Sequence, residues 1–414
     1  MEQKKLVPKR RFEGFTEEWK ERTIGELADI VGGGTPSTGN KEYWDGDIDW
    51  YSPVEIGEQI YVDGSQRKIT ELGLQKSSAR ILPVGTVLFT SRAGIGNTAI
   101  LAKEGATNQG FQSILPHGNE LDTYFIFSRS HELKRYGETN GAGSTFVEVS
   151  GKQMAKMPLL VPGLDEQQKI GHFFKRLDEM ITTQQRKLEK AKALKSAYLA
   201  EMFPTEGERV PKRRFSGFTD EWKLRELQDV CYVFDDGDWI ESKDQSNNGI
   251  RLIQTGNIGF TEFINNESNK KWISEATFKR LNCNEVFPGD ILISRLPDPA
   301  GRACIIPDLG TRMITSVDCT IVRTSEKFSA DFLVQYLSTS NYFKTVTSLL
   351  GGGTRQRISR SYLATIKVPF PQTLDEQKRI GSFFKIIDKT ITFHQRKLEK
   401  LQALKQAYLH EMFV

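Results

Sequence analysis

Polar side chains that can read the edges of nucleic-acid bases stand on several glycine-punctuated loops of this sequence. Arginine presents a forked donor that suits guanine, and the side-chain amide of asparagine or glutamine suits adenine, provided that an ordered loop holds them. In the first half of the chain the candidates are Arg92, Asn97, Asn108, Gln109, Ser144 and Thr145. In the second half they are Arg295, Arg302, Thr354, Arg355, Gln356 and Arg357.

The loop from Gly351 to Arg357 carries the strongest prediction of DNA contact. Its run of glycines lets the backbone approach a phosphate closely, and the side chains that follow supply both charge and forked donors. A glycine-rich hairpin with solvated arginines is the alternative interpretation.

An acidic cluster in the second half is the main candidate for catalysis. Asp235, Asp236, Asp238, Glu241 and Lys243 could hold magnesium for phosphodiester hydrolysis, which would make the chain a magnesium-dependent DNA endonuclease. The acids are crowded into one loop and the first half has no counterpart, which favours an ordinary acidic turn. The sequence also lacks a complete dinucleotide loop, a P-loop and the Asn/Asp-Pro-Pro-Tyr/Phe motif of adenine methyltransferases. We therefore predict no catalytic residue, metal or cofactor in this chain.

The composition predicts a multi-domain cytoplasmic protein. A length of 414 residues suits two or three domains, no apolar run approaches a membrane span, and the amino-terminal residues do not resemble a secretion signal. Cys231, Cys283, Cys304 and Cys319 lack metal-ligand spacing, so we expect reduced, buried thiols. Because the formal net charge is only +4, contacts to DNA must come from local clusters or from partners.

The elements that must position these loops form a tandem repeat. Residues 7–20 and 210–223 are identical at 12 of 14 positions, and residues 164–203 and 374–413 at 27 of 40. The segments between them, about 24–160 and 227–370, share little continuous identity, but both contain short β-rich runs punctuated by Gly and Pro. We predict an α+β protein with two strand-rich globular domains that share a fold and differ in their contact residues.

The longer repeated segment predicts one long amphipathic helix in each half, because apolar residues recur in it at heptad spacing. A single helix cannot bury its own apolar stripe, so the two should pack as an antiparallel two-helix coiled coil about a pseudo-two-fold axis. Gln184 and His394, near the midpoints, should then face each other. The residues expected in the helix-pair interface are Ile170, Phe174, Leu177, Ile181, Gln184, Leu188, Ile380, Phe384, Ile387, Ile391, His394 and Leu398.

These expectations define the domain boundaries. The first globular domain with its repeat segment covers residues 1–162, the first helix 163–203, a linker with the second repeat segment and globular domain 204–371, and the second helix 372–414. A helix of about 39 residues is roughly 58 Å long, which spans on the order of 17 base pairs, so the helix pair would act as a spacer between two half-sites.

The shorter repeated segment places basic residues beside aromatic ones. Lys9-Arg10-Arg11 and Lys212-Arg213-Arg214 could touch phosphates, but the neighbouring Phe12 and Trp19, with their counterparts in the second copy, favour docking against the helix pair. The RKLEK runs at 186–190 and 396–400 suit a solvated helix face or a surface that binds a partner.

This layout resembles the specificity subunits of Type I restriction-modification systems along essentially the whole chain. The resemblance is carried by PKRRFEGFTEEWK and PKRRFSGFTDEWK, by LDEQQKIGHFFK with its partner at 374–385, and by GGGTPS at 32–37 and ATNQG at 106–110. The second domain departs from the pattern, since Thr315–Thr320 stands where the first has ATNQG.

The resemblance implies a non-catalytic subunit that recognises a bipartite double-stranded DNA target. It also implies two modification (methyltransferase) subunits docked on the paired helices, and restriction subunits as further partners. S-adenosylmethionine, and ATP with magnesium, would bind to those partners. A structural coiled-coil adaptor without sequence preference is the alternative of a different class.

Overall fold

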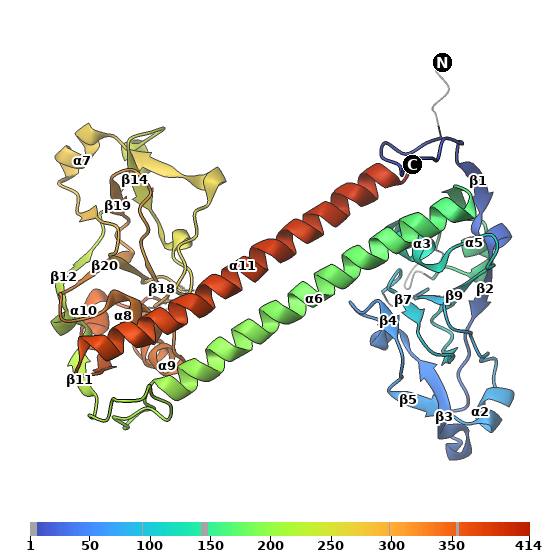
Figure 1. Ribbon diagram of the computed structural model, residues 1–414, viewed down its shortest axis with the longest axis horizontal. Helices are drawn as coiled ribbons and strands as arrows, with labels where there is room; N and C mark the ends of the chain where they lie inside the picture. Colours follow the sequence, from blue (N-terminus) through green and yellow to red (C-terminus); the bar gives the residue numbers. More distant parts are fainter. Residues whose placement is uncertain (1–5, 93, 142–147, 298, 353–355) are drawn as a thin grey trace. The chain divides into compact units, whose positions relative to one another are not determined.

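The structure is a computed structural model that describes residues 6–92, 94–141, 148–297, 299–352 and 356–414. These described residues divide into two compact units. Unit 1 runs to Gln184 and takes in Lys397–Val414, and unit 2 comprises Gln185–Arg396. Each unit thus contains a globular domain together with a part of each long helix, α6 (Leu164–Met202) and α11 (Leu374–Met412) (Figure 1).

Short strands form the sheets of unit 1. One sheet has the order β2-β9-β6-β7-β4, and a second has the order β5-β3-β8, in which β3 pairs antiparallel with β5 and parallel with β8. A further antiparallel pair joins β1, which enters the domain, to β10, which leaves it. The strands are β1 Lys20–Thr23, β2 Ala28–Gly32, β3 Trp44–Tyr51, β4 Tyr61–Val62, β5 Arg67–Ile69, β6 Val87–Phe89, β7 Thr98–Leu101, β8 Ala106–Thr107, β9 Gln112–Pro116 and β10 Pro158–Val161.

Strand β6 shows why these sequences form a sheet that is buried on both faces. Val87 and Phe89 point into one hydrophobic core, and Leu88 points into another on the opposite face. Short helices cover the sheets and begin at polar caps, such as Asp122 for α3 and Ser150 for α5. The helices are α1 Ile24–Leu27, α2 Glu71–Gln75, α3 Thr123–Ser128, α4 Ser130–Asn140 and α5 Gly151–Ala155.

Unit 2 repeats this plan with different residues. Its sheets have the orders β12-β20-β17-β18 and β13-β15-β14-β19-β16, and β11 pairs antiparallel with β21. Along β17, Ile291 and Ile293 enter one core and Leu292 enters another, as β6 does in unit 1. The strands are β11 Lys223–Glu226, β12 Cys231–Asp236, β13 Gln245–Ser246, β14 Ile250–Ile253, β15 Lys271–Ile273, β16 Glu285–Val286, β17 Ile291–Ser294, β18 Ala303–Ile305, β19 Met313–Thr315, β20 Cys319–Thr324 and β21 Lys367–Phe370.

The short helices of unit 2 also begin at polar caps. Ser329 caps α8, Thr339 caps α9 and Ser359 caps α10, each by accepting a hydrogen bond from a backbone N–H in the first turn. The helices are α7 Glu275–Leu281, α8 Ala330–Tyr336, α9 Ser340–Ser348 and α10 Arg360–Ala364.

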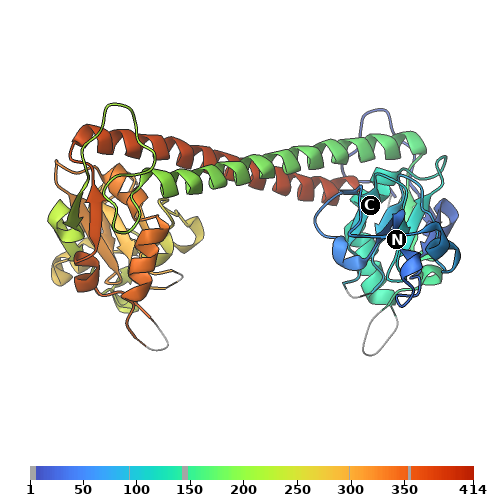
Figure 2. The same cartoon turned by 90° about the horizontal axis from the view of Figure 1, so that it is seen from below.

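The two long helices are α6 Leu164–Met202 and α11 Leu374–Met412. In unit 1 the amino-terminal part of α6 packs along the carboxyl-terminal part of α11, with ring centroids 4.9 Å apart for Phe173 and Tyr408. In unit 2 the roles are exchanged, and Tyr198 of α6 lies 4.9 Å from Phe383 of α11. Within each unit the helices therefore run antiparallel (Figures 1 and 2), as the repeat predicts.

Partly buried ion pairs lie among the apolar contacts of the helices. In unit 1 the Lys405 ammonium is 2.6 Å from the Asp178 carboxylate, which also accepts a hydrogen bond of 2.9 Å from the Tyr124 hydroxyl of α3. In unit 2 Lys195 is likewise 2.6 Å from Asp388. A lysine at an interface position of the heptad is thus accommodated because an aspartate on the facing helix neutralises it.

The shorter repeated segment docks onto the helices. Arg11 makes a bidentate ion pair of 2.6 and 2.7 Å with Glu166 at the start of α6, and Arg10 pairs at 2.5 Å with Glu411 near the end of α11. Trp19 is fully buried in the core of unit 1. The second copy repeats this arrangement in unit 2, where Arg214 pairs with Glu376. The docking interpretation of these basic residues is confirmed.

Candidate nucleic-acid interface

Backbone hydrogen bonds gather four loops of unit 1 at one end of its strands. These loops follow β2, β3, β6 and β8. The parallel pairing of β3 with β8 brings two of them together, although about 55 residues of sequence separate them. The bonds between the loops join Gly34 N to Thr107 O at 2.8 Å, Asn108 N to Tyr51 O at 3.0 Å, and Ser91 N to Gly110 O at 2.8 Å.

Four predicted contact residues of unit 1 lie on these loops. Asn97 is exposed and donates through Nδ2 to the Ile56 carbonyl at 3.1 Å. Asn108 is half-buried, and its Oδ1 accepts from Gly110 N at 2.7 Å. Gln109 is exposed, and its Oε1 accepts from the Thr35 hydroxyl.

Arg92 is half-buried, with its guanidinium 3.9 Å from Glu148. The structure thus brings Arg92, Asn97, Asn108 and Gln109 onto one connected set of loops. Ser144 and Thr145 lie outside the described residues.

The matching loops of unit 2 hold different side chains. Gln356 and Arg357 are exposed, and the Arg357 guanidinium is 3.9 Å from Asp318. Arg302 is half-buried on the turn between β17 and β18. Thr354 and Arg355 lie outside the described residues.

Arg295 is buried, unlike the other predicted contacts that the structure describes. Its side chain is only 8% exposed, its guanidinium lies 3.3 Å from Asp236, and it donates to the Val317 carbonyl. In this free chain the side chain joins two loops and does not extend into solvent. Base contact by Arg295 stays a prediction that would require these bonds to open.

Glycines fix the correspondence between the two sets of loops. A Cβ on Gly33 would lie 2.0 Å from the Asn108 carbonyl oxygen, and a Cβ on Gly237 would lie 2.3 Å from that of Ser316. Asn108 and Ser316 are therefore equivalent, which places Val317 where unit 1 has Gln109. Only a residue without a side chain fits so close to another backbone.

The pairs Ser91-Arg92 and Ser294-Arg295 look alike in the sequence, but the backbone hydrogen bonds show that their arginines are not structurally equivalent. Ser91 N donates to Gly110 O at 2.8 Å, and Arg295 N donates to Asp318 O at 2.8 Å. Arg295 thus corresponds to Ser91, and Arg92 has no equivalent arginine in unit 2. The two domains share loop geometry while differing in side-chain chemistry.

The acidic cluster of unit 2 does not form an open carboxylate site. Asp235 is 2.5 Å from Arg360, Asp236 is 3.3 Å from Arg295, and Glu241 is 2.8 Å from Lys243. Asp238 Oδ2 accepts from Asn284 N at 2.9 Å, and burial raises the pKa of this carboxyl. Among the residues that the structure describes, no group of three or more His, Cys, Asp or Glu side chains could hold a metal ion.

The predicted helix-interface residues lie mostly on buried faces. Half-buried positions are Ile181, Ile391 and His394. Ile170 and Phe174 belong to the core of unit 1, so this end of α6 packs on the globular domain as well as on α11. As a complete interface the set stays a prediction, as does the facing of Gln184 and His394. The buried members are Ile170, Phe174, Leu177, Gln184, Leu188, Ile380, Phe384, Ile387 and Leu398.

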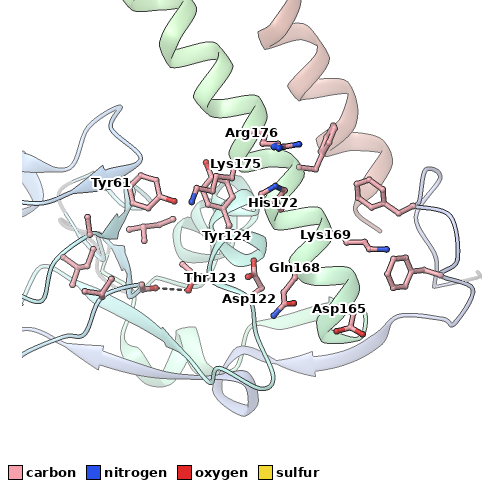
Figure 3. Close-up of a pocket in the computed structure, with 18 residues that line it drawn as sticks. Tyr61, Asp122, Thr123, Tyr124, Asp165, Gln168, Lys169, His172, Lys175 and Arg176 are labelled. Carbon is pink, nitrogen blue, oxygen red and sulfur yellow. Dashed lines mark hydrogen bonds between the residues drawn. The ribbon is translucent and has the colours of Figure 1, made fainter.

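A separate pocket of about 1080 Å³ lies in unit 1 between α6, the β4–β7 edge and the repeat segment (Figure 3). Its α6 side presents Lys169, His172, Lys175 and Arg176. Tyr61 faces them from β4, with the Lys175 ammonium 5.8 Å from its ring centroid. The described base-reading candidates do not line this pocket, so it is a surface distinct from the recognition loops.

Comparison with known proteins identifies the chain. The family model of the Type I restriction modification DNA specificity domain matches residues 16–193 and 219–403. The chain belongs to this family. The resemblance inferred from the repeated motifs is thereby confirmed. Curated relatives of the chain are named specificity subunits.

The relatives of this chain differ in their sequence identity to it and in the length over which they match it. The MjaIX specificity subunit of Methanocaldococcus jannaschii is 36% identical over 42% of the chain and 40% of that protein. The EcoR124I/EcoR124II specificity subunit of Escherichia coli is 30% identical over 39% of the chain and 41% of that protein. The chain thus matches less than half the length of these two. The MjaVIII specificity subunit of M. jannaschii is 23% identical over 95% of the chain and 92% of that protein.

A solved structure shows the same fold. The S subunit of a Type-I restriction-modification system from M. genitalium covers 99% of both chains with a TM-score of 0.68, at 14% sequence identity. The predicted α+β fold with two strand-rich domains and paired long helices is confirmed. No described helix is both long and apolar enough to cross a membrane.

Sequence reasoning missed the residues that neutralise charge inside the helix pair. Asp178 and Asp388 had no predicted role, although each lies in the same register of its helix. The signal was available, because Lys195 and Lys405 occupy apolar heptad positions and a partly buried lysine is stabilised by a carboxylate partner.

Proposed function

We propose that this chain is the DNA-reading subunit of a Type I restriction-modification enzyme and that it recognises a bipartite double-stranded target. Each strand-rich domain reads one half-site through the loops described above. The observation that carries the proposal is that the specificity-domain match occurs twice, once in each half of the chain.

The side chains on equivalent loops differ between the two domains, which supports the recognition of two different half-sites. Equivalent loop positions hold Gln109 in unit 1 and Val317 in unit 2. An exposed amide suits adenine, whereas a valine offers no hydrogen bond to a base edge. Two readers with one fold and unlike side chains suit an asymmetric target.

Partners supply the chemistry under this proposal. The paired helices dock two modification subunits, which bind S-adenosylmethionine and methylate adenine, and restriction subunits with ATP and magnesium join the complex. The chain itself positions these subunits on DNA and acts in the cytoplasm, where its target lies.

The endonuclease alternative receives no support from the acidic cluster. Asp235 and Asp236 are engaged by arginines that neutralise them. A magnesium ion would have to displace those guanidinium groups before it could bind.

Methylation mapping tests the proposal. Genomes with and without the gene for this chain are compared, and one bipartite adenine-methylated motif is expected to disappear. Exchange of residues 24–160 for the corresponding domain of another family member should then change one half of that motif and leave the other half intact. Persistence of the motif without the gene, or a change in both halves, refutes the proposal.

A binding assay separates the proposal from the adaptor alternative. The complex with modification subunits should bind the bipartite DNA at least a thousandfold more tightly than scrambled DNA of the same length and at the same salt concentration. An adaptor without sequence preference would show equal affinities. Cleavage of DNA by the purified chain with magnesium would instead favour the endonuclease.

A further inference from the structure

An exposed valine stands on a rigid turn beside the recognition loops of unit 1. Pro53–Glu55 forms a single 3-10 turn that follows β3, and Val54 at its tip is 87% exposed. This is a larger exposed fraction than that of any other large hydrophobic side chain in the described part of the chain. An isolated exposed valine needs no explanation by itself, so the construction of the turn is what matters.

Polar side chains fix this turn from within. The Glu55 carboxylate closes a capping box by accepting from Ser52 N and Oγ, both at 2.8 Å, through one oxygen. Its other oxygen accepts from Gln66 N at 2.7 Å. Both carboxylate oxygens are therefore engaged, and the turn presents the apolar side chain of Val54 outward.

The turn is also tied to the loops that carry the predicted base readers. Asn97 Nδ2 donates to the Ile56 carbonyl at 3.1 Å, directly after the turn. A Cβ on Gly110 would lie 2.7 Å from Pro53 Cγ, so the loop with Asn108 and Gln109 lies against the ring of this proline. The turn that carries Val54 is thus held against the loops that carry these amide side chains.

Unit 2 contains the same turn with no side chain at its tip. Thr255–Asn257 forms a 3-10 turn after β14, and Asn257 Oδ1 accepts from Gln254 N at 3.0 Å in place of the Glu55 bond. Gly256 occupies the position of Val54. A Cβ on Gly256 would have no neighbour within 4 Å, and the backbone there is not in the left-handed region, so a larger residue fits without strain.

We propose that this position determines specificity, and that Val54 contacts the C5 methyl group of a thymine in the first half-site. An apolar side chain distinguishes thymine in the major groove through that methyl group, while neighbouring amides read adenine. Gly256 leaves the equivalent contact unmade in the second half-site. The inference rests on the proposed function, because it requires these loops to face DNA.

Removal of the methyl group from the DNA tests the contact directly. The complex with modification subunits is titrated with target duplexes in which each thymine of the first half-site, on either strand, is replaced singly by uracil. One position should weaken binding by roughly three- to fivefold, the effect of exposing about one buried methyl group. Val54→Ala should weaken binding to the thymine duplex by a similar factor and should no longer respond to uracil there.

Matched variants control for folding and for surface chemistry. Val84→Ala removes another exposed valine of unit 1, one that lines the separate pocket, and should leave DNA affinity unchanged. Gly256→Val installs the missing side chain in unit 2 and should change the base preference within the second half-site only. All three variants should melt at the temperature of the parent chain, because each position is open to solvent.

The outcomes separate this inference from the proposed function. If the parent complex discriminates against a scrambled first half-site but no thymine responds to uracil, or Val54→Ala keeps the response, the specificity role is wrong and the proposed function stands. If Gly256→Val leaves the second half-site preference unchanged, the assignment of this turn to the DNA-facing surface is overturned. If the parent complex discriminates against no scrambled half-site, the proposed function itself fails.

Discussion

The buried ion pair between Arg11 and Glu166 is expected to hold the repeat segment onto the start of α6. Glu166 is 1% exposed and Arg11 is 14% exposed, so water screens the pair weakly. Arg11→Ala would leave the Glu166 carboxylate buried without its arginine partner. Loss of one partner of such a pair destabilises proteins by about 3–5 kcal/mol.

The lower end of that range applies here. Glu166 lies in the first turn of α6, where the helix dipole partly stabilises a negative charge. We therefore expect a loss of about 3 kcal/mol, which corresponds to a fall of roughly 6–12 °C in the melting temperature of a unit of this size. Arg214→Ala should have the same effect in unit 2, because Glu376 is equally buried.

Differential scanning calorimetry of the full chain measures this effect, with Arg10→Ala as the matched control. Arg10 carries the same charge one residue earlier, but its ion pair with Glu411 is exposed, at 57% and 36% for the two side chains. Exposed pairs contribute little because water and salt screen them. If Arg11→Ala lowers the melting temperature no more than Arg10→Ala does, the argument from burial is wrong.

Three further predictions follow from the described contacts. Gly33→Ala should weaken DNA binding by the complex at least tenfold, because the new Cβ would lie 2.0 Å from the Asn108 carbonyl oxygen. Gly39→Ala is the control and should bind normally, because its Cβ would lie 4.0 Å from the nearest side-chain atom; equal affinities of the two variants in a titration would contradict this. Asp178→Ala should destabilise unit 1 by about 3 kcal/mol, since it leaves Lys405 and the Tyr124 hydroxyl without their acceptor. The double variant Asp178→Ala with Lys405→Met should recover part of this loss, and calorimetry that shows strictly additive effects of the two substitutions would refute the pairing. Burial raises the pKa of Cys231 and Cys304 to about 12 and of Cys283 and Cys319 to about 11, so far less than one per cent of each thiol is thiolate at pH 8. Iodoacetamide should therefore alkylate none of the four thiols until the chain is denatured, and mass spectrometry that finds rapid alkylation of the native chain would refute this.

The sequence alone determined the features that depend on periodicity and on repetition. The heptad pattern in residues 164–203 and 374–413 predicts two long helices because apolar spacing along a helix is a local property. The matched copies predict pairing of those helices and two similar domains, and the motifs identify the family. The docking of Arg10 and Arg11 also followed from the aromatic residues beside them.

Tertiary structure decided which loops meet and which charged side chains are exposed. Parallel pairing of β3 with β8 brings Asn108 beside the turn that carries Val54, and such a contact between distant segments has no local signal. Arg295 and Arg357 are both predicted contacts in the sequence, yet Arg295 is buried against Asp236 and Arg357 is exposed. Burial and partners are properties of the folded chain, because they depend on what the other strands place around each side chain.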